Sequence, residues 1–595
     1  MTRTTHFERR GGDARIPRRR SGLFWVLVVL AVLVVIAAWL GFRAYQIESN
    51  LQSARSALTE AERSLHTAAP VPATLVHSAQ SHTRTARDAA RDPVWSLVAH
   101  IPFLGRPLRT TAGIAEIGDR ITHQSLPTLL AVDDQLQKVK NADAVHALPL
   151  PTMRTVGRSL SDVDTQMRDD LYALQHLPGS YVSPVSHARD KLLNQLTGVS
   201  GQVHAAAVST TIGVPMLGGN GPRRYFVMFE NPAETRPDMG LIGGFAEVVA
   251  TNGRLHVVKS GSNSDLPPMR LPSGANAPVQ TVGYSDFGAG STWLSSNLSP
   301  DFSEDAALMG AAYATVTGRT IDGVIALDPV AMGRIEQIAG RSVTVPHAGT
   351  YSGDQLATFL ENGEYALKMP EDQRKLLLAD VGKQSMEALL ASHVPALDLA
   401  RALGSLAGTG HLRLYSLHPA EQAELAQFPI AGTLPTTSRP FLGAYVINAS
   451  ATKLDYYLDE SVAYQATSCK PAAATVRVTL TNNVPAHGVP AFVTSGNVAF
   501  SRSLSKDHNQ VLLSLVVSPG ARITSATVAG KPVTWSLKTV ERGNHPTYLT
   551  ELDLPPRAPV TVNVAISQPG THGPALIGTQ PLPRQPKATV TGTAC

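Results

Sequence analysis

The longest uninterrupted run of hydrophobic residues lies near the start of the chain. Leu23 to Phe42 contains no charged side chain and, at ~1.5 Å per residue, spans roughly 30 Å as a helix. Trp25 and Trp39 lie near its two ends, where amphipathic rings prefer the membrane interface. The run is longer than the ~7 to 15 residues of a signal-peptide core, and no small-x-small cleavage site follows it closely. The pattern predicts an uncleaved transmembrane helix over residues 23–42, with a cleaved signal peptide as the alternative.

A heptad-like spacing of apolar residues follows this run. Separations of 4, 3, 4, 3 and 4 place them on one helical face, which comprises Ile47, Leu51, Ala54, Leu58, Ala61 and Leu65. The spacing lasts only about three heptads, which favours an amphipathic helix packed on its own domain over a stalk or one arm of a helical hairpin. Helical patterns interrupted by prolines continue to about residue 210. We therefore predict an extracytoplasmic helical bundle over residues 43–212.

Strand-like and helix-like segments alternate in the middle of the chain, over residues 213–438. The run GLIGGFAEVVATNGRLHVVKS reads as two strands joined at Asn252-Gly253, a dipeptide that favours a two-residue β-hairpin turn. The later run TIDGVIALDPVAMGRIEQIAGRSVTVP reads as a strand, a helix and a second strand. Asp328 is placed to cap that helix, a proline lies in its first turn, and Gly340 lies just past its end. The alternation predicts a mixed α/β domain.

Helical patterns disappear from about residue 439. Short alternating runs then lie between Gly, Pro and Asn turns, namely TVRVTLTNNVP, QVLLSLVVSP, RITSATVAGKPVTWSL and VTVNVAISQP. Such runs are typical of a β-sandwich, which we predict for residues 439–595. The expected fold class is therefore multidomain α+β, with a single N-terminal transmembrane helix, a helical bundle, a central α/β domain and a C-terminal β-sandwich.

The charge of the chain is concentrated at its N-terminus. The chain has 51 basic and 46 acidic residues, and residues 1–20 hold seven Arg against Glu8 and Asp13. The remainder therefore has 44 residues of each sign, which gives no basic surface for a nucleic acid backbone. The end of a membrane helix that is flanked by basic residues usually lies on the cytoplasmic side. We predict a basic cytoplasmic tail over residues 1–22 and place everything after the helix outside the cell membrane.

Only two cysteines occur in the sequence, Cys469 and Cys595. An even pair in an exported chain indicates a disulfide. A bond between them ties the last predicted strand to the first of the predicted sandwich. Two unpaired thiols are the alternative.

The usual enzyme signatures are missing from the sequence. It contains no His-Glu-x-x-His, no Gly-x-Ser-x-Gly, no Cys-x-x-Cys and no Gly-x-Gly-x-x-Gly fingerprint. The residues alone therefore identify no catalytic group and no cofactor.

The most distinctive polar segment is NPAETRPDMGLIGGF, Asn231 to Phe245, which leaves a hydrophobic strand and returns through glycines. Arg236 suits bidentate binding of phosphate, and Glu234 with Asp238 suits a divalent cation. Glu234 alternatively orients Arg236 by a charge-assisted hydrogen bond, the role that we favour. The glycines would let the main chain approach a ligand closely. An ordinary surface turn with an internal Arg-carboxylate pair is the competing interpretation.

Several segments resemble a family of membrane-anchored actinobacterial and related envelope proteins, the domain of unknown function 4012 family. The strongest is YFVMFENPAETRPDMGLIGGFAEVVATNGRL, and others include DPVWSLVAHIPFLGRPLRT, TGRTIDGVIALDP, HLRLYS and KLDYYLDESVAYQ. Together they extend from about residue 90 to about residue 500. The resemblance implies anchorage in a cell envelope and carries no activity.

A weaker resemblance connects the central domain with the LytR-CpsA-Psr envelope proteins. Those proteins hold a polyprenyl pyrophosphate glycan with arginines and Mg²⁺ and transfer it to peptidoglycan. The resemblance places Arg236 and Asp238 near that family's Arg-x-Asp loop and Arg374 near its later arginine-bearing helix. The second loop of that family has an Arg-Asp pair, whereas this chain offers only Lys259 and Asp265. Mg²⁺ and glycan transfer are thus implied by resemblance alone.

These observations lead to one hypothesis and one alternative. The hypothesis is an envelope protein that binds a polyprenyl-phosphate-linked glycan, or another anionic envelope precursor, through Asn231, Glu234, Arg236, Asp238 and Arg374, with phosphotransfer as its extended form. The alternative is a non-catalytic scaffold that recruits other envelope proteins.

Overall fold

The computed structural model describes residues 20–66, 71–141, 149–272, 284–345, 348–367, 369–390, 394, 396–469, 472–495 and 505–592. The chain divides into two compact units. We call residues 1–137 with 155–209 the helical unit, and residues 138–154 with 210–595 the mixed unit. The fold is thus multidomain α+β, as the sequence predicts. The basic residues of the predicted cytoplasmic tail before residue 20 lie outside the described residues.

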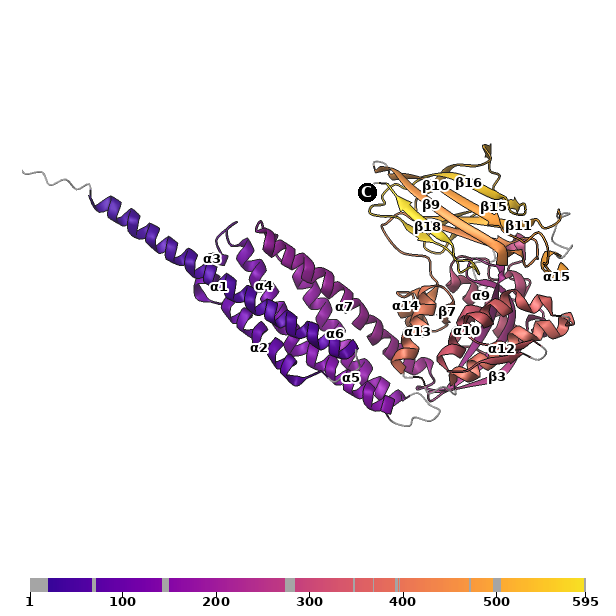
Figure 1. Ribbon diagram of the computed structural model, residues 1–595, viewed down its shortest axis with the longest axis horizontal. Helices are drawn as coiled ribbons and strands as arrows, with labels where there is room; N and C mark the ends of the chain where they lie inside the picture. Colours follow the sequence, from indigo (N-terminus) through magenta and orange to yellow (C-terminus); the bar gives the residue numbers. More distant parts are fainter. Residues whose placement is uncertain are drawn as a thin grey trace, which may run out of the picture. The chain divides into compact units, whose positions relative to one another are not determined.

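The helical unit is built from long helices (Figure 1). They are α1 (Arg20–His66), α2 (Ala73–Ala90), α3 (Pro93–Ala99), α4 (Arg106–Arg120), the π-turn η1 (Ile121–Ser125), α5 (Leu126–Asn141), α6 (Leu150–Gln175) and α7 (Ser183–Met216). Prolines begin several of these helices, because a first-turn residue needs no N–H donor. The predicted membrane run and the following heptad spacing form one continuous helix, α1.

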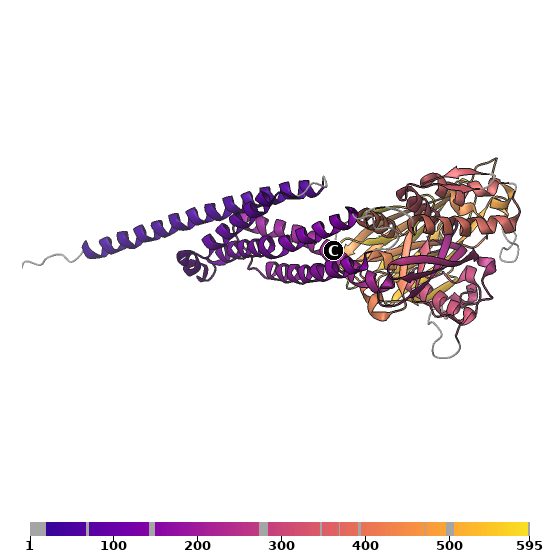
Figure 2. The same cartoon turned by 90° about the horizontal axis from the view of Figure 1, so that it is seen from below.

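Helix α1 has two parts with different environments. Its N-terminal part extends clear of the other helices of the unit in both Figure 1 and Figure 2. By length and composition, it is the one described helix that is apolar enough to cross a membrane. Further along, Ile47, Ala54, Ala57 and Ala61 are buried. This face packs on α2, which agrees with the prediction of an amphipathic helix packed on its own domain.

A five-stranded sheet forms the centre of the mixed unit, with the strand order β3-β2-β1-β4-β7. Its strands are β1 (Arg223–Thr235), β2 (Gly240–Thr251), β3 (Arg254–Ser262), β4 (Gly323–Leu327) and β7 (Leu412–Ser416). Only β1 and β4 are parallel. Phe226 and Met228 of β1 share a core with α9 (Phe302–Thr317). Phe229 faces Gly382 of α12 (Glu371–Leu390). Alternate residues of β1 therefore point to helices on opposite faces of the sheet.

Several shorter elements surround this sheet. They are α10 (Pro329–Ile338), β5 (Val343–Val345), β6 (Gly349–Tyr351), α11 (Asp354–Glu361), α13 (Ala396–Gly408) and α14 (Pro419–Leu425), with 3-10 turns η2 (Asn263–Asp265), η3 (Ser285–Phe287), η4 (Trp293–Ser295), η5 (Gly363–Ala366), η6 (Pro429–Ala431) and η7 (Leu454–Tyr457). Strands β5 and β6 pair with each other.

Two local signals from the sequence are confirmed. Asn252 and Gly253 join β2 to β3 with φ values of 50° and 79°, the left-handed region that a two-residue hairpin turn requires. Asp328 caps α10, since its carboxylate accepts from the amide of Ala331 at 2.9 Å. Gly340 follows the helix with φ 65°.

Two further sheets follow residue 440. One has six strands in the order β13-β12-β16-β10-β9-β18, and the other has five in the order β14-β15-β11-β8-β17. Their bounds are β8 (Phe441–Asn448), β9 (Leu458–Cys469), β10 (Ala472–Asn482), β11 (Asn509–Val517), β12 (Arg522–Val528), β13 (Lys531–Pro532), β14 (Leu537–Glu541), β15 (His545–Leu554), β16 (Pro559–Ser567), β17 (Leu576–Gly578) and β18 (Lys587–Thr591), with the short helix α15 (Ala491–Thr494). Buried side chains of both sheets contribute to one hydrophobic core, which includes Val446, Val478 and Leu513.

These two sheets and the central sheet belong to one compact unit. The amide of Thr235 donates to Asp455 at 2.9 Å, and Gln580 donates to the carbonyl of Arg236 at 2.9 Å. The predicted boundary between residues 438 and 439 therefore falls inside a unit that buried hydrogen bonds hold together.

Candidate functional site

The segment from Asn231 to Phe245 forms a bulged hairpin. Strand β1 continues to Thr235, which pairs with Gly240 at the start of β2, and the register shifts between Asn231 and Thr235. A Cβ atom on Gly240 would lie 2.3 Å from the main chain of Asn231, a distance that no side chain tolerates. The glycine is therefore explained by close approach of two protein strands.

The next two glycines of the segment lie against α12. A Cβ atom on Gly243 would lie 2.6 Å from Leu378, and one on Gly244 would lie 3.0 Å from Ala379. Both glycines let a helix pack closely on β2. The sequence predicts that these glycines let a ligand approach the main chain closely. In the structure, helix α12 occupies that space.

Asn231 and Arg236 bond to the protein itself. The amide nitrogen of Asn231 donates to the carbonyl of Leu360 and the hydroxyl of Tyr365, both at 3.1 Å. The guanidinium of Arg236 donates to three main-chain carbonyls, of Thr235 at 3.0 Å, Asn448 at 3.2 Å and Leu294 at 3.3 Å. Arg236 is buried, and burial lowers its pKa although nearby carboxylates raise it. Its contacts are those of a structural arginine that joins the hairpin to β8.

Asp238 also faces inward. One of its oxygens accepts from Nε of Arg413 at 3.1 Å, and the other has no hydrogen-bond partner among the described residues. Burial raises the pKa of Asp238 to about 6, against the lowering effect of Arg413.

Buried acids lie at the carboxyl ends of the two parallel strands. Glu230 follows Phe229 and Asp328 follows Leu327, the last residues that pair between β1 and β4. Glu230 accepts from the amide of Gly240 at 3.1 Å, and Asp328 bonds to Nδ1 of His411. Burial, with the nearby charge of Asp238, holds the pKa of Glu230 well above its usual range. Both acids are fully buried, so the network is closed to ligands in this conformation.

The residues of this region do not fit a divalent cation. Among the described residues, no three His, Cys, Asp or Glu side chains gather as metal ligands. Asp238 is already paired with Arg413, and Glu234 with Lys453. We therefore derive no chemical step through Mg²⁺ here.

Glu234 and Arg374 meet at a group that we call the Phe492 cluster, comprising Glu234, Glu364, Arg374, Lys453 and Phe492. Glu234 pairs with the ammonium of Lys453 at 2.6 Å, so it does not have the predicted role of orienting Arg236. Lys453 lies 5.1 Å from the ring centroid of Phe492, and the guanidinium of Arg374 lies 4.4 Å from the same ring. Arg374 lies in the first turn of α12, as predicted for a helix that begins near Pro370. Two cations therefore share one aromatic ring.

Arg374 is the least satisfied cation of this cluster. Within the described part of the chain it makes one hydrogen bond, from Nη2 to the carbonyl of Met369 at 3.0 Å. Its Nε and Nη1 are buried and have no hydrogen-bond partner in the described part of the chain. Burial raises the pKa of Glu364 to about 8, although Arg374 and Lys453 lower it. Glu364 is thus mostly neutral at pH 7, which leaves one positive charge in excess in the Phe492 cluster.

Sequence reasoning missed Lys453, Phe492 and Glu364. Lys453 begins KLDYYLDESVAYQ, one of the segments that carry the family resemblance. No local pattern connects these three residues with Glu234, because they lie far from it along the chain and meet only on folding.

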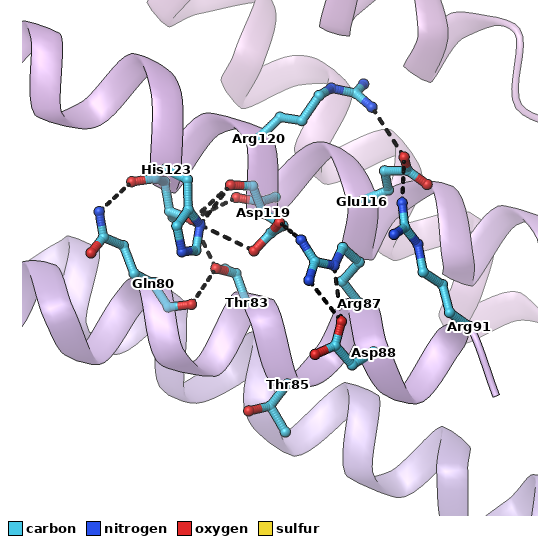
Figure 3. A network of polar contacts seen from close by, with 12 residues as sticks. Gln80, Thr83, Thr85, Arg87, Asp88, Arg91, Glu116, Asp119, Arg120 and His123 are labelled. Carbon is cyan, nitrogen blue, oxygen red and sulfur yellow. Dashed lines mark hydrogen bonds and ion pairs between the residues drawn. The ribbon is translucent and has the colours of Figure 1, made fainter.

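A separate polar network lies in the helical unit (Figure 3). Arg87 donates to Asp119 at 2.5 Å, His123 contacts the main-chain oxygen of Asp119 at 3.0 Å, and the hydroxyls of Thr83 and Thr122 lie 2.8 Å apart. The network joins α2 to α4 and to the π-turn η1. Since its members bond to one another, it acts to hold these helices in register.

Comparison with known proteins gives one family. Residues 220–365 match the family model described as "Protein of unknown function (DUF4012)". No curated protein matches the chain. A solved structure of a putative nutrient binding protein from Legionella pneumophila is similar over 21% of this chain and 43% of its own length, at 10% identity and a TM-score of 0.13, which is too low to support an argument. The matched residues contain the hairpin, the strand-end acids and Glu364, so residues 220–365 of this chain form a region of the DUF4012 family.

Proposed function

We propose that this chain is a membrane-anchored extracytoplasmic envelope protein that binds an anionic envelope precursor, with a polyprenyl-phosphate-linked glycan as the ligand class. Helix α1 supports the anchor, since it is long and apolar enough to cross a bilayer. The proposed ligand class rests on one observation about Arg374. Its guanidinium lies on the ring of Phe492 beside Lys453, and two of its nitrogens have no hydrogen-bond partner among the described residues.

The chemistry of the Phe492 cluster suits a phosphate. A guanidinium presents N–H groups in a fork that matches two phosphate oxygens, and an ammonium adds a point charge. Two nitrogens of Arg374, Nε and Nη1, have no hydrogen-bond partner among the described residues. Because both are buried in this conformation, the Arg374 side chain must turn outward to bond a phosphate through them. The surrounding side chains include Tyr365, whose ring stacks with Phe492 at 5.7 Å. An aromatic wall beside two cations favours a ligand that has both an anionic and an apolar part.

Binding of a short-chain polyprenyl phosphate tests this proposal. Losing a charged hydrogen-bond partner typically costs about 1.5 to 3 kcal/mol, so Arg374→Ala is expected to weaken binding by roughly ten-fold or more. Lys453→Ala is also expected to weaken binding of the polyprenyl phosphate. Arg236→Ala serves as the matched control, because its guanidinium bonds to three main-chain carbonyls and its loss lowers stability. Wild-type affinity in folded Arg374→Ala and Lys453→Ala proteins contradicts the proposal.

Topology is tested separately. A phosphatase reporter fused after Cys595 is expected to be active, since alkaline phosphatase functions only after export. An inactive reporter on a fusion protein that accumulates at full length reverses the assignment of every domain. Phosphotransfer to peptidoglycan extends the proposal by resemblance to the LytR-CpsA-Psr proteins, and no group in the Phe492 cluster is assigned to it.

A scaffold that recruits other envelope proteins is the second candidate. It is favoured because the side chains of Asn231, Arg236 and Asp238 bond to other groups of the protein, which gives the hairpin a structural role. Chemical cross-linking of the full chain in intact cells, followed by mass spectrometry, tests it. The scaffold function predicts reproducible partners whose yield is unchanged in the Arg374→Ala variant.

A further inference from the structure

The helical unit exposes a compact group of large apolar side chains. We call it the Phe103 patch, and it consists of Leu97, Ile101, Phe103, Leu104, Tyr181 and Val182. Their exposed fractions range from 37% for Val182 to 73% for Leu97. The first four lie in α3 and the turn after it, and the last two lie in the turn between α6 and α7. Contiguous exposed apolar groups of this kind mark interaction surfaces.

The backbone holds Phe103 outward. Phe103 has a φ of 68°, a left-handed conformation that bulky residues rarely adopt. Its ring stacks on that of Tyr181 at 5.2 Å, and the guanidinium of Arg106 lies 5.7 Å from it. The hydroxyl of Tyr181 donates to the carbonyl of Leu104 at 3.4 Å. The two turns therefore form one surface, with a strained residue at its centre.

Contacts with α1 place this surface at the end of the apolar run. Asp92 caps α3 and accepts from Nε1 of Trp39 at 3.1 Å and from Arg43 at 2.8 Å. Trp39 lies three residues before Phe42, the end of the uncharged run. In Figure 1, α3 lies at the end of the helical unit where α1 continues alone.

The path of the chain brings the second turn to the same end. Helix α2 packs along α1 and runs back toward the apolar run of α1. Helix α4 then leads away from the apolar run, and α6 runs back toward it. Thr110 of α4 donates to the carbonyl of Pro178 at 2.6 Å, which fixes the turn after α6 beside the turn after α3. Both turns thus lie level with Trp39.

We infer that the Phe103 patch is a second membrane contact, seated in the lipid interface on the side of the bilayer from which the helical unit emerges. This inference rests on the proposed anchoring of α1. A lipid interface is favoured over a protein partner because the patch combines aliphatic side chains with Tyr181 and Arg106, the residue types that prefer the boundary between acyl chains and headgroups. Trp39, at the same level, has the same preference. Two contacts restrict how the helical unit tilts about α1.

Lipid photo-cross-linking tests the inference on the full chain in vesicles of phosphatidylcholine and phosphatidylglycerol. A benzophenone amino acid is placed at Phe103, and in a second protein at Leu104, to guard against local distortion. The matched control carries it at Val199, an exposed apolar residue of α7, about 24 Å along that helix from Ser183. Probes at Phe103 and Leu104 are expected to give several-fold more lipid adduct than the probe at Val199.

Extraction of the vesicles with alkaline carbonate distinguishes failure of the α1 membrane anchor from failure of the second membrane contact at the Phe103 patch. If the chain stays in the membrane but the probes at Phe103 and Leu104 give no more lipid adduct than Val199, the second contact is wrong and the anchor stands. Adducts with protein in place of lipid also overturn the contact. If carbonate releases the chain, the anchor fails and the contact fails with it.

Discussion

The carboxylate of Glu234 lies 2.6 Å from the ammonium group of Lys453, and this ion pair joins β1 to the residue that precedes η7. Both side chains are largely buried, with exposed fractions of 14% and 13%. The pair explains why Glu234 does not orient Arg236. It also brings Lys453 to Phe492 and Arg374, so the predicted binding residues are divided between a structural hairpin and the Phe492 cluster.

Removing either partner of this ion pair is expected to lower the free energy of unfolding. Lys453→Ala leaves Glu234 without its partner in a poorly solvated place, at a cost of about 1 to 3 kcal/mol. Urea unfolding of Lys453→Ala, Glu234→Ala and the double variant measures this effect. The double variant should lose less than the sum of the single losses, by about 0.5 kcal/mol or more. Additive losses contradict a direct pair.

Glu460 is expected to make stability fall with rising pH. Both its carboxyl oxygens are buried without a partner in the described part of the chain, and burial raises its pKa to about 8. The folded state thus keeps a proton that the unfolded state releases near pH 4.5. The stability contribution is full below that pH and is lost as pH rises toward 8.

The isosteric variant Glu460→Gln isolates this effect. At pH 7 it should be about 1 to 3 kcal/mol more stable than the wild type, and the difference should vanish toward pH 4.5. Thermal unfolding at several pH values provides the measurement. A difference that is independent of pH shows that Glu460 does not titrate as described.

Gly253 is expected to be required for stability of the β2–β3 hairpin. Its φ of 79° follows a φ of 50° at Asn252, and a side chain in the left-handed region costs about 1 kcal/mol or more. Gly253→Ala should therefore lower the free energy of unfolding by about 1 kcal/mol. Gly404→Ala, in helix α13 with open space around its Cβ position, is the control and should be neutral or stabilising.

The pairing of Cys469 with Cys595 stays a prediction, because Cys595 lies outside the described residues. Strand β18 runs parallel to β9, and their last pair is Thr591 with Gln465. Each cysteine follows its member of that pair by four residues. We expect a disulfide-linked peptide in a non-reducing digest of the native protein, and a loss of about 2 to 4 kcal/mol in the free energy of unfolding on reduction. Two thiols that alkylate freely in the native protein exclude the bond.

The sequence alone determined the features that depend on near neighbours. The uncharged run of α1, the Asn252-Gly253 turn and the Asp328 cap are properties of adjacent residues, and all three appear in the structure. Their local geometry is set by backbone preferences, so no distant contact is needed to specify them. The family segment around the hairpin was equally visible, and residues 220–365 match the family model.

Only the tertiary structure decided which polar side chains face inward. Arg236 and Arg374 are equally charged in the sequence, yet Arg236 meets carbonyls of Asn448 and Leu294 while Arg374 meets the ring of Phe492. Position 240 requires glycine because the main chain of Asn231 lies too close for a Cβ atom. Whether a charge binds a ligand or the protein depends on the groups that surround it, and here those groups come from β8, η4 and α15, far along the chain, so their contacts exist only after folding.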